Sequence, residues 1–282
     1  MSKRAKTTTH LRMNTHFDTA KARAALEQMY KRPTDASSDD TEMDLVGGTA
    51  NSTYVRRIKY PPSLRMMAWD GTEDVEVTVK LRGILCGFSL PPVAKPNKLS
   101  QLRNLRQHVK VTALGLDAFD QAMANLLQIH GMFSSFVGSA EAVQPLDFLP
   151  YEGNPSIDSH ARYFTDRHLS PYEKNEPLSH WIDPERALTA IQPPTFIHGP
   201  DNIVDYCTLM GDEYLYDRYA LHDPKLFKAG DIVEISFSCV AIPVKGSAYK
   251  LILNLRALTL IDDQLRLVRS SKTMQTISAN RT

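Results

Sequence analysis

The sequence predicts a soluble α+β protein built on a mostly antiparallel β-sheet or a partly open barrel, with one covering helix and a long proline-rich insertion. Three observations predict this class. Apolar and polar residues alternate in segments 74–90 and 231–262, as they do in half-buried strands. Apolar residues recur at helical spacing near 117–129. Ten of the 17 prolines lie between 145 and 225, where periodicity is lost.

The first 50 residues are expected to form a flexible leader in front of the globular body. Eight lysines and arginines lie before Pro33, opposed by only two acidic residues, and five acidic residues then follow within 35–44. Residues 17–32 show helical spacing, with Asp18 placed to cap the helix. A basic arm of this kind can contact nucleic acid, act as a nuclear import signal or remain a solvated tail.

Strands are expected to build the body. Four segments read as strands or pairs of strands: 54–60, 74–90, 107–115 and 231–262. The last forms a hairpin whose turn is bracketed by Pro243 and Gly246. One face of this hairpin is apolar, and the other carries Lys250, Asn254 and Arg256. The apolar face is expected to close a core, and the polar face suits contact with an anionic or polar partner.

The helix near 117–129 is expected to cover one end of the sheet. Asp117 is placed to cap its start, Phe119 and Leu126 lie in its apolar stripe, and Gly131 is expected to end it. The chain then divides into three parts: a leader at 1–50, one β-rich body at 51–265 with its insertion at about 145–225, and a basic tail at 266–282.

Several classes of protein are disfavoured. No run approaches the roughly 18 apolar residues of a membrane span, and the N-terminus has no apolar signal segment, so we expect no membrane association and an intracellular location. The widely spaced Cys86, Cys207 and Cys239 are typical of free thiols in a reducing compartment. The signatures GxxxxGK(S/T), GxGxxG, GxSxG and HExxH are absent, so we expect no cofactor and no enzyme of those classes.

Histidines are concentrated in the proline-rich insertion. The five are His160, His168, His180, His198 and His222. A metal-dependent enzyme would need several of them, or Cys207 and nearby acids, to converge on one point. Histidines in loops more often bond to the backbone, so we predict no metal site and keep a metal-dependent enzyme as the second alternative function.

Basic residues interleaved with aromatic ones favour binding of a single nucleic acid strand. Phosphates need lysine or arginine, and bases stack on aromatic rings. Such residues gather beside the predicted strands and in the acid-free segment 91–109. The candidate binding residues are Tyr54, Arg56, Arg57, Lys59, Tyr60, Trp69, Lys80, Arg82, Lys95, Lys98, Arg103, Arg106, Lys110, Lys250 and Arg256.

A resemblance lies in the last third of the chain. Residues 201–204, 230–234, 243, 250 and 255–262 form the pattern DNIV, GDIVE, P, K and LRALTLID. By this pattern the chain resembles a large family of poorly characterised fungal proteins. Members of that family usually have a serine after the arginine, and this chain has Ala257 at that position. That resemblance implies no catalytic residues. The strand led by Gly-Asp and the hairpin are also similar to oligonucleotide-binding (OB) folds, which implies a surface for a nucleic acid strand.

The function expected from the sequence is non-enzymatic binding of single-stranded nucleic acid, with DNA favoured over RNA. Phosphates would meet the basic groove and bases would stack on aromatic rings, so binding would weaken steeply with salt. The first alternative is a self-assembling coat or nucleocapsid-like protein. This alternative fits the basic arm, the acidic linker and the β-rich body with long loops. The same features are compatible with a homo-oligomer.

Overall fold

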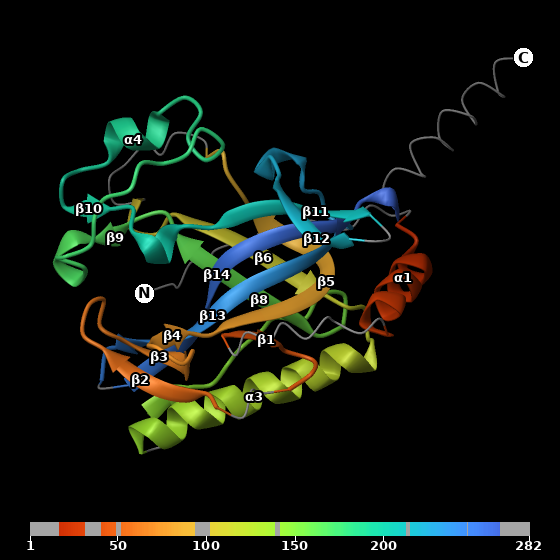
Figure 1. Cartoon of the computed structure of the whole chain (residues 1–282), viewed down its shortest axis with the longest axis horizontal. Coiled ribbons are helices and arrows are strands. Elements are labelled where there is room, and N and C mark those ends of the chain that lie inside the picture. The colour runs from red at the N-terminus through yellow and green to blue at the C-terminus, as the bar shows by residue number, and fades with distance from the viewer. Residues whose placement is uncertain are drawn as a thin grey trace, which may run out of the picture.

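A computed structural model describes residues 17–31, 41–48, 52–93, 102–138, 142–212, 215–246 and 248–265 (Figure 1). It confirms an α+β protein built on one large, mostly antiparallel sheet. Across the described residues the sheet has 12 strands, and its main path runs β12-β11-β14-β13-β5-β6-β8. Within the described ranges this path does not close into a barrel.

The predicted hairpin forms the centre of the sheet. Strands β13 (Ile232–Val244) and β14 (Ala248–Asp262) pair antiparallel along almost their whole length, and β5 (Thr78–Ser89) pairs with the other edge of β13. The apolar face is buried as expected. The polar face is also largely covered, because Glu234, Ser236 and Ser238 are each at most 7% exposed. The hairpin is therefore a central layer with two covered faces.

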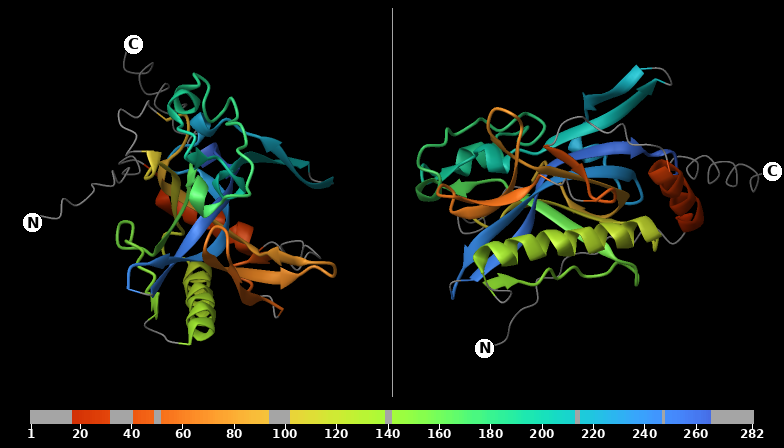
Figure 2. Two further views of the ribbon diagram at one scale, coloured as in Figure 1. Left: turned by 90° about the vertical axis from the view of Figure 1, so that its left-hand side faces the viewer. Right: turned by 60° about the horizontal axis from the view of Figure 1, so that its bottom comes forward.

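The proline-rich insertion contributes strands to the same sheet. These strands were not predicted, because the sequence of the insertion has no clear periodicity. Strand β8 (Ser156–Arg162) extends β6 (Arg106–Thr112) at one edge. Strands β11 (Asp205–Asp212) and β12 (Leu215–Leu221) form a hairpin at the other edge, and Figure 2 shows this hairpin projecting from the body. In the described part of the insertion, the residues before β8 and between β8 and β11 contain no strand longer than two residues and no helix longer than five.

Shorter elements complete the fold. They are β1 (Glu42–Asp44), β2 (Tyr54–Ile58), β3 (Ser63–Trp69), β4 (Asp74–Glu76), β7 (Val143–Gln144), β9 (Thr165–Asp166), β10 (Phe196–Ile197), α4 (Ala187–Ile191), and the 3-10 turns η2 (Arg167–Leu169), η3 (Pro200–Asn202) and η4 (Pro224–Leu226). Strand β2 pairs with β3, and β3 pairs in turn with β4 and β13.

Helix α3 (Asp117–Val137) lies along one face of the sheet (Figures 1 and 2). Its buried stripe includes Phe119, Leu126 and Phe133, spaced seven residues apart. The helix passes through Gly131 and ends at Gly138, whose φ of 82° gives the left-handed cap, so the expected stop at Gly131 is wrong. Asp117 lies inside the helix and does not cap it. No helix in the described ranges has the length and apolar character needed to cross a membrane.

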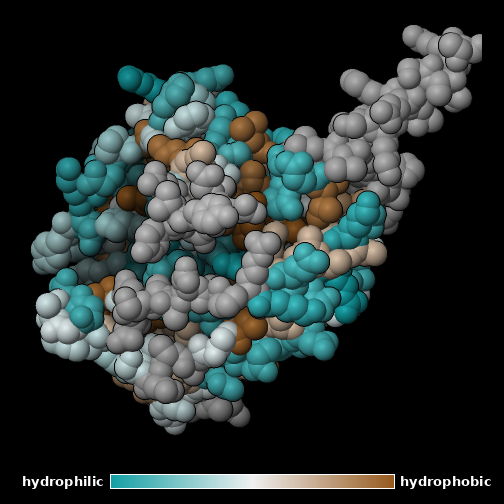
Figure 3. All heavy atoms as spheres, turned by 45° about the vertical axis from the view of Figure 1, so that its right-hand side comes forward, coloured by the Kyte–Doolittle hydropathy of each residue, from teal (hydrophilic) through white to brown (hydrophobic). Residues whose placement is uncertain are grey.

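Part of the expected flexible leader is folded onto the body. Helix α1 (Thr19–Lys31) buries Ala22 and Leu26 completely, and Asp18 caps it as predicted by accepting a hydrogen bond from the Lys21 N–H at 3.1 Å. Tyr30 donates its hydroxyl proton to the carbonyl oxygen of Arg82 on β5. The outward face of α1 is hydrophilic (Figure 3). Apolar contacts therefore hold α1 against the body. The prediction of a flexible leader was based on its charges, which do not indicate these contacts.

A second, smaller hydrophobic cluster supports the insertion. Its buried members are Leu102, Tyr163, Phe164, Ile182 and Leu188. These residues join the start of the β6 segment to the chain that follows β8. The lobe built on this cluster faces the main sheet, and the candidate site lies where lobe and sheet meet.

Gly230, just before β13, predicts a stability difference. Its φ is +97°, and a Cβ there would lie 2.6 Å from the Phe17 ring, whereas Gly246 has a φ of +89° with nothing within 4 Å of such a Cβ. We expect Gly246→Ala to cost about 1 kcal/mol, from the left-handed backbone alone. Gly230→Ala should cost roughly 2 kcal/mol or more because it also displaces Phe17. Urea unfolding of both variants checks this, and equal losses would contradict it.

Candidate functional site: a cationic pocket

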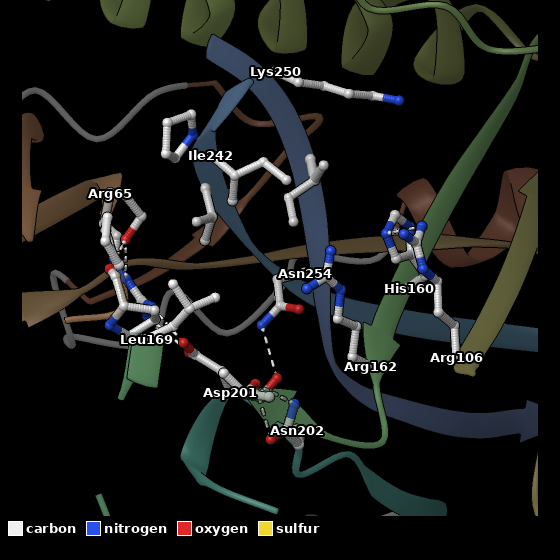
Figure 4. Close-up of a pocket in the computed structure, with 17 residues that line it drawn as sticks. Arg65, Arg106, His160, Arg162, Leu169, Asp201, Asn202, Ile242, Lys250 and Asn254 are labelled. Atoms are coloured by element: carbon white, nitrogen blue, oxygen red, sulfur yellow. Dashed lines mark hydrogen bonds and ion pairs between the residues drawn. The ribbon is translucent and has the colours of Figure 1, made fainter. Parts of the chain in front are cut away.

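The site is a pocket of about 320 Å³ between the main sheet and the lobe of the insertion (Figure 4). Eight of its polar residues come from five elements. Arg106 begins β6, His160 and Arg162 end β8, Lys250 and Asn254 lie on β14, Arg65 lies on β3, and Asp201 and Asn202 lie in η3. Its apolar wall includes Leu169, Val240, Ile242 and Ile252. This volume is at the lower end of the ~300–1,000 Å³ typical of small-molecule sites.

Strand register brings two arginines together at the pocket. Arg106 on β6 is directly opposite Arg162 on β8, and His108 is opposite His160. Like charges directly opposite each other destabilise a sheet. Among the described residues, Arg106, Arg162 and Lys250 have no acidic partner. The described part of the fold therefore places three positive charges at this pocket without an ion pair to any of them, which is the arrangement that an anionic ligand requires.

His160 lies in the middle of these charges and is neutral. Burial, followed by the charges of Arg106, His108, Arg162 and Lys250, lowers its pKa from 6.5 to about 3. Its Nε2 lies 3.0 Å from Arg106 Nη1, so the unprotonated nitrogen can accept that N–H. Burial and the charge of Arg162 lower the pKa of Arg106 as well, although an arginine stays charged.

The neutrality of His160 gives a prediction that NMR can check. In the free protein, the ring C–H resonances of His160 should stay constant between pH 8 and pH 5, because its pKa is about 3. The same resonances in urea-unfolded protein should titrate near ~6.5. Since the folded pKa is depressed, the free energy of unfolding should fall as pH drops from about 6.5 toward 3. A folded-state midpoint near 6.5 would contradict this description of the pocket.

A neutral network of two arginines and two carboxylates forms one wall. Arg65 Nη1 lies 3.1 Å from both Glu76 carboxylate oxygens and 2.9 Å from Asp201 Oδ1. Arg256 Nη2 lies 2.5 Å from Glu76 Oε2 and 3.0 Å from Asp201 Oδ1. Each guanidinium therefore contacts both acids. Burial opposes ionisation of Asp201, but the hydrogen bonds and charges of Arg65 and Arg256 outweigh it and lower its pKa.

Backbone contacts fix this wall in place. The carbonyl oxygen of Asp201 accepts a hydrogen bond from Asn254 Nδ2 at 3.3 Å, and that of Asn202 accepts one from Gln107 Nε2 at 3.0 Å. Asn202 Oδ1 accepts the Gly199 N–H at 2.9 Å, which closes the turn. The η3 turn is thereby joined to β6 and β14, and the wall is organised before any ligand arrives.

Among the described residues, six of the twelve basic side chains predicted to bind are paired with acids. The pairs are Arg56 with Asp74, Lys80 with Glu42, Arg82 with Glu234, Arg103 with Asp166, Lys110 with Asp158, and Arg256 with Glu76 and Asp201. Lys110 is also buried, at 3% exposed, and donates to the carbonyl oxygen of Leu149. These cations contribute to the fold, and their charges are not concentrated in a groove.

The structure brings only part of the predicted set together. Arg106 and Lys250 meet in the pocket, and Tyr60 lies at the rim of an adjoining one. Tyr54, Arg57, Lys59 and Trp69 are exposed on the β2–β4 side. Lys95 and Lys98 lie outside the described residues. The sequence analysis missed Arg65, Arg162 and Asp201 as site residues, although Asp201 was part of the DNIV pattern.

The predicted histidine cluster does not gather at one point. His198 Nδ1 bonds to the carbonyl oxygen of Tyr163 at 2.9 Å, while His160 faces Arg106. In the described part of the chain, no three His, Cys, Asp or Glu side chains are placed to hold a metal ion.

A search with protein-family models and a search of curated proteins found no match to this chain.

Proposed function

We propose that this protein is a non-enzymatic binding protein for single-stranded nucleic acid, and that the cationic pocket is its phosphate-binding centre. The observation that carries the proposal is the convergence of Arg106, Arg162 and Lys250 around a neutral histidine, without an acidic partner among the described residues. Arginine and lysine in this arrangement suit the oxygens of a phosphate group.

The shape of the site favours a flexible single strand over a duplex. The pocket is a recess about 320 Å³ in volume, which a flexible phosphodiester backbone can enter and a rigid double helix cannot. We also propose that the sheet binds the strand in the way that OB folds do. The strand would cross the outward face of β6 and β8 near the start of β14, as a strand crosses neighbouring strands in those folds.

Binding of labelled oligonucleotides tests the proposal. We expect fluorescence anisotropy to show that a single strand binds at low salt and that its affinity falls steeply as salt rises. The matching duplex, measured under the same conditions, should bind more weakly. The absence of any complex with single-stranded DNA or RNA at low salt would overturn the proposal.

Self-assembly is a second candidate function, favoured by the outer edge of the sheet. Strand β12 ends the main path of the sheet, and the β11–β12 hairpin carries exposed Met210, Tyr219 and Leu221 at 59%, 52% and 79%. An exposed edge strand with apolar side chains is a template for pairing with another chain. Light scattering that shows particles much larger than one chain would favour this candidate, and a mass of 31.7 kDa would exclude it under the conditions used.

A further inference from the structure

A second pocket adjoins the cationic one and differs from it in chemistry. It has a volume of about 240 Å³ and shares five lining residues with the first: Pro61, Arg65, Thr165, Asp201 and Asn202. The neutral wall of Arg65 and Asp201 therefore separates two compartments of one continuous site. A ligand that spans this wall would contact both compartments.

The second pocket has apolar and aromatic side chains in its lining. Ile58, Met67 and Ile197 line it, and Tyr60 stands at its rim. The Tyr60 ring is 36% exposed and meets the ring of Tyr172 edge-on, with centroids 5.5 Å apart. An exposed ring beside an apolar recess is the platform on which a nucleobase stacks, and base–aromatic stacking tolerates any base.

Charge distinguishes the two compartments. The described acids that line the second pocket are Glu76, Asp201 and Glu173, and Asp201 also lines the first. The first two are held by Arg65 and Arg256, while Glu173 has no side-chain partner within the described ranges. A free carboxylate repels phosphate and accepts N–H groups. An anionic group should therefore enter the first pocket, and an N–H donor should enter the second.

We infer that the two compartments bind one nucleotide unit, with its phosphate on Arg106, Arg162 and Lys250, its base against Tyr60, and an exocyclic amino group of that base donating to Glu173. This inference rests on the proposed function and specifies its ligand. A carboxylate accepts from the amino group of cytosine, adenine or guanine, but thymine and uracil have no such group. The site should therefore prefer cytosine to thymine, both as a free nucleotide and within a strand.

Competition experiments test each part of this inference. A labelled oligodeoxycytidine bound to the full-length protein is displaced with inorganic phosphate, deoxyribose 5-phosphate, deoxycytidine monophosphate or thymidine monophosphate. We expect the cytidine nucleotide to compete about 10-fold better than deoxyribose 5-phosphate, because stacking adds affinity. It should also compete about 10-fold better than the thymidine nucleotide. Direct titration with oligodeoxycytidine and oligothymidine shows whether the same preference holds within a strand.

Two variants separate the contributions. Tyr60→Ala should remove the advantage of the cytidine nucleotide over deoxyribose 5-phosphate while leaving the sugar phosphate unchanged. Glu173→Gln should remove the preference for cytosine over thymine. The matched controls are Trp181→Ala and Glu185→Gln, because these exposed residues line neither pocket and should change neither ratio.

The outcomes distinguish this inference from the proposed function. If oligonucleotides bind but all nucleotides compete like deoxyribose 5-phosphate, and Tyr60→Ala has no effect, the inference is overturned and the proposed function stands. If neither oligonucleotides nor nucleotides bind at low salt, both fail. If the nucleotides, titrated directly into the protein by calorimetry, bind with the expected preference and strands do not, the inference holds for free nucleotides and the proposed function fails.

Discussion

Removing two charges from the cationic pocket is expected to weaken single-strand binding about 100-fold, since each charged hydrogen bond contributes about 1.5–3 kcal/mol. The variant is Arg162→Gln with Lys250→Gln, which removes both charges and shortens both side chains. Neither residue has an acidic partner among the described residues, so their replacement breaks no ion pair in the free protein. The folded state should therefore be retained, and it should gain stability from reduced repulsion with Arg106.

The salt dependence of binding makes this prediction specific. For a single strand, the slope of log affinity against log salt is about 0.7 per neutralised phosphate, so the double variant should lower it by roughly 0.7 to 1.4. The matched control is Arg23→Gln with Lys31→Gln on α1, which removes the same charge from residues that line neither pocket, at the cost of one exposed ion pair between Lys31 and Glu27. If the control loses as much affinity as the pocket variant, binding depends on overall charge and the pocket is not its centre.

Long and continuous patterns allowed the frame of the fold to be predicted. Strands β5, β13 and β14 alternate over many residues, so these strands were found close to their true positions; α3 repeats its apolar stripe for five turns and was found at its true start, although it extends beyond the expected stop at Gly131. Strand β8 was not found. Its core-facing positions include Ser159 and Ala161, and its outward positions carry His160 and Arg162, so its contrast between faces is weak. Prolines on both sides made the segment look like a loop.

The site could be predicted only in part, because its formation depends on contacts between distant segments. Local sequence identified Arg106, Lys250 and Arg256 as basic residues beside strands. It did not show that Arg256 meets Glu76, 180 residues earlier, and Asp201, 55 residues earlier. Whether a cation is free to bind a ligand is decided by such pairs. The sequence supplied the candidates, and tertiary pairing selected Arg106 and Lys250 from them.

The wall of the pocket should be costly to break. Asp201→Ala is expected to lower the free energy of unfolding by about 2–3 kcal/mol, because Arg65 and Arg256 lose a shared partner in a largely buried network. The side chains of Arg65 and Asp201 are only 11% and 26% exposed. The matched control is Asp74→Ala, whose partners Tyr54 and Arg56 are 37% and 52% exposed and whose loss should cost less than about 1 kcal/mol. Urea unfolding of both variants measures the difference.

The pH dependence of this effect identifies its origin. Because the folded pKa of Asp201 is lowered, its contribution to stability is fully present above the unfolded value of about 3.9 and is lost as pH falls through the folded value. Wild type and Asp201→Ala should therefore converge in stability only in acid below that range. Asp201→Ala also removes one negative charge from the wall of the pocket, so the wall changes from neutral to positive. The folded variant should therefore bind single strands more tightly than the folded wild type does. A stability loss no larger than that of Asp74→Ala, or one independent of pH, would mean that the network does not hold the wall.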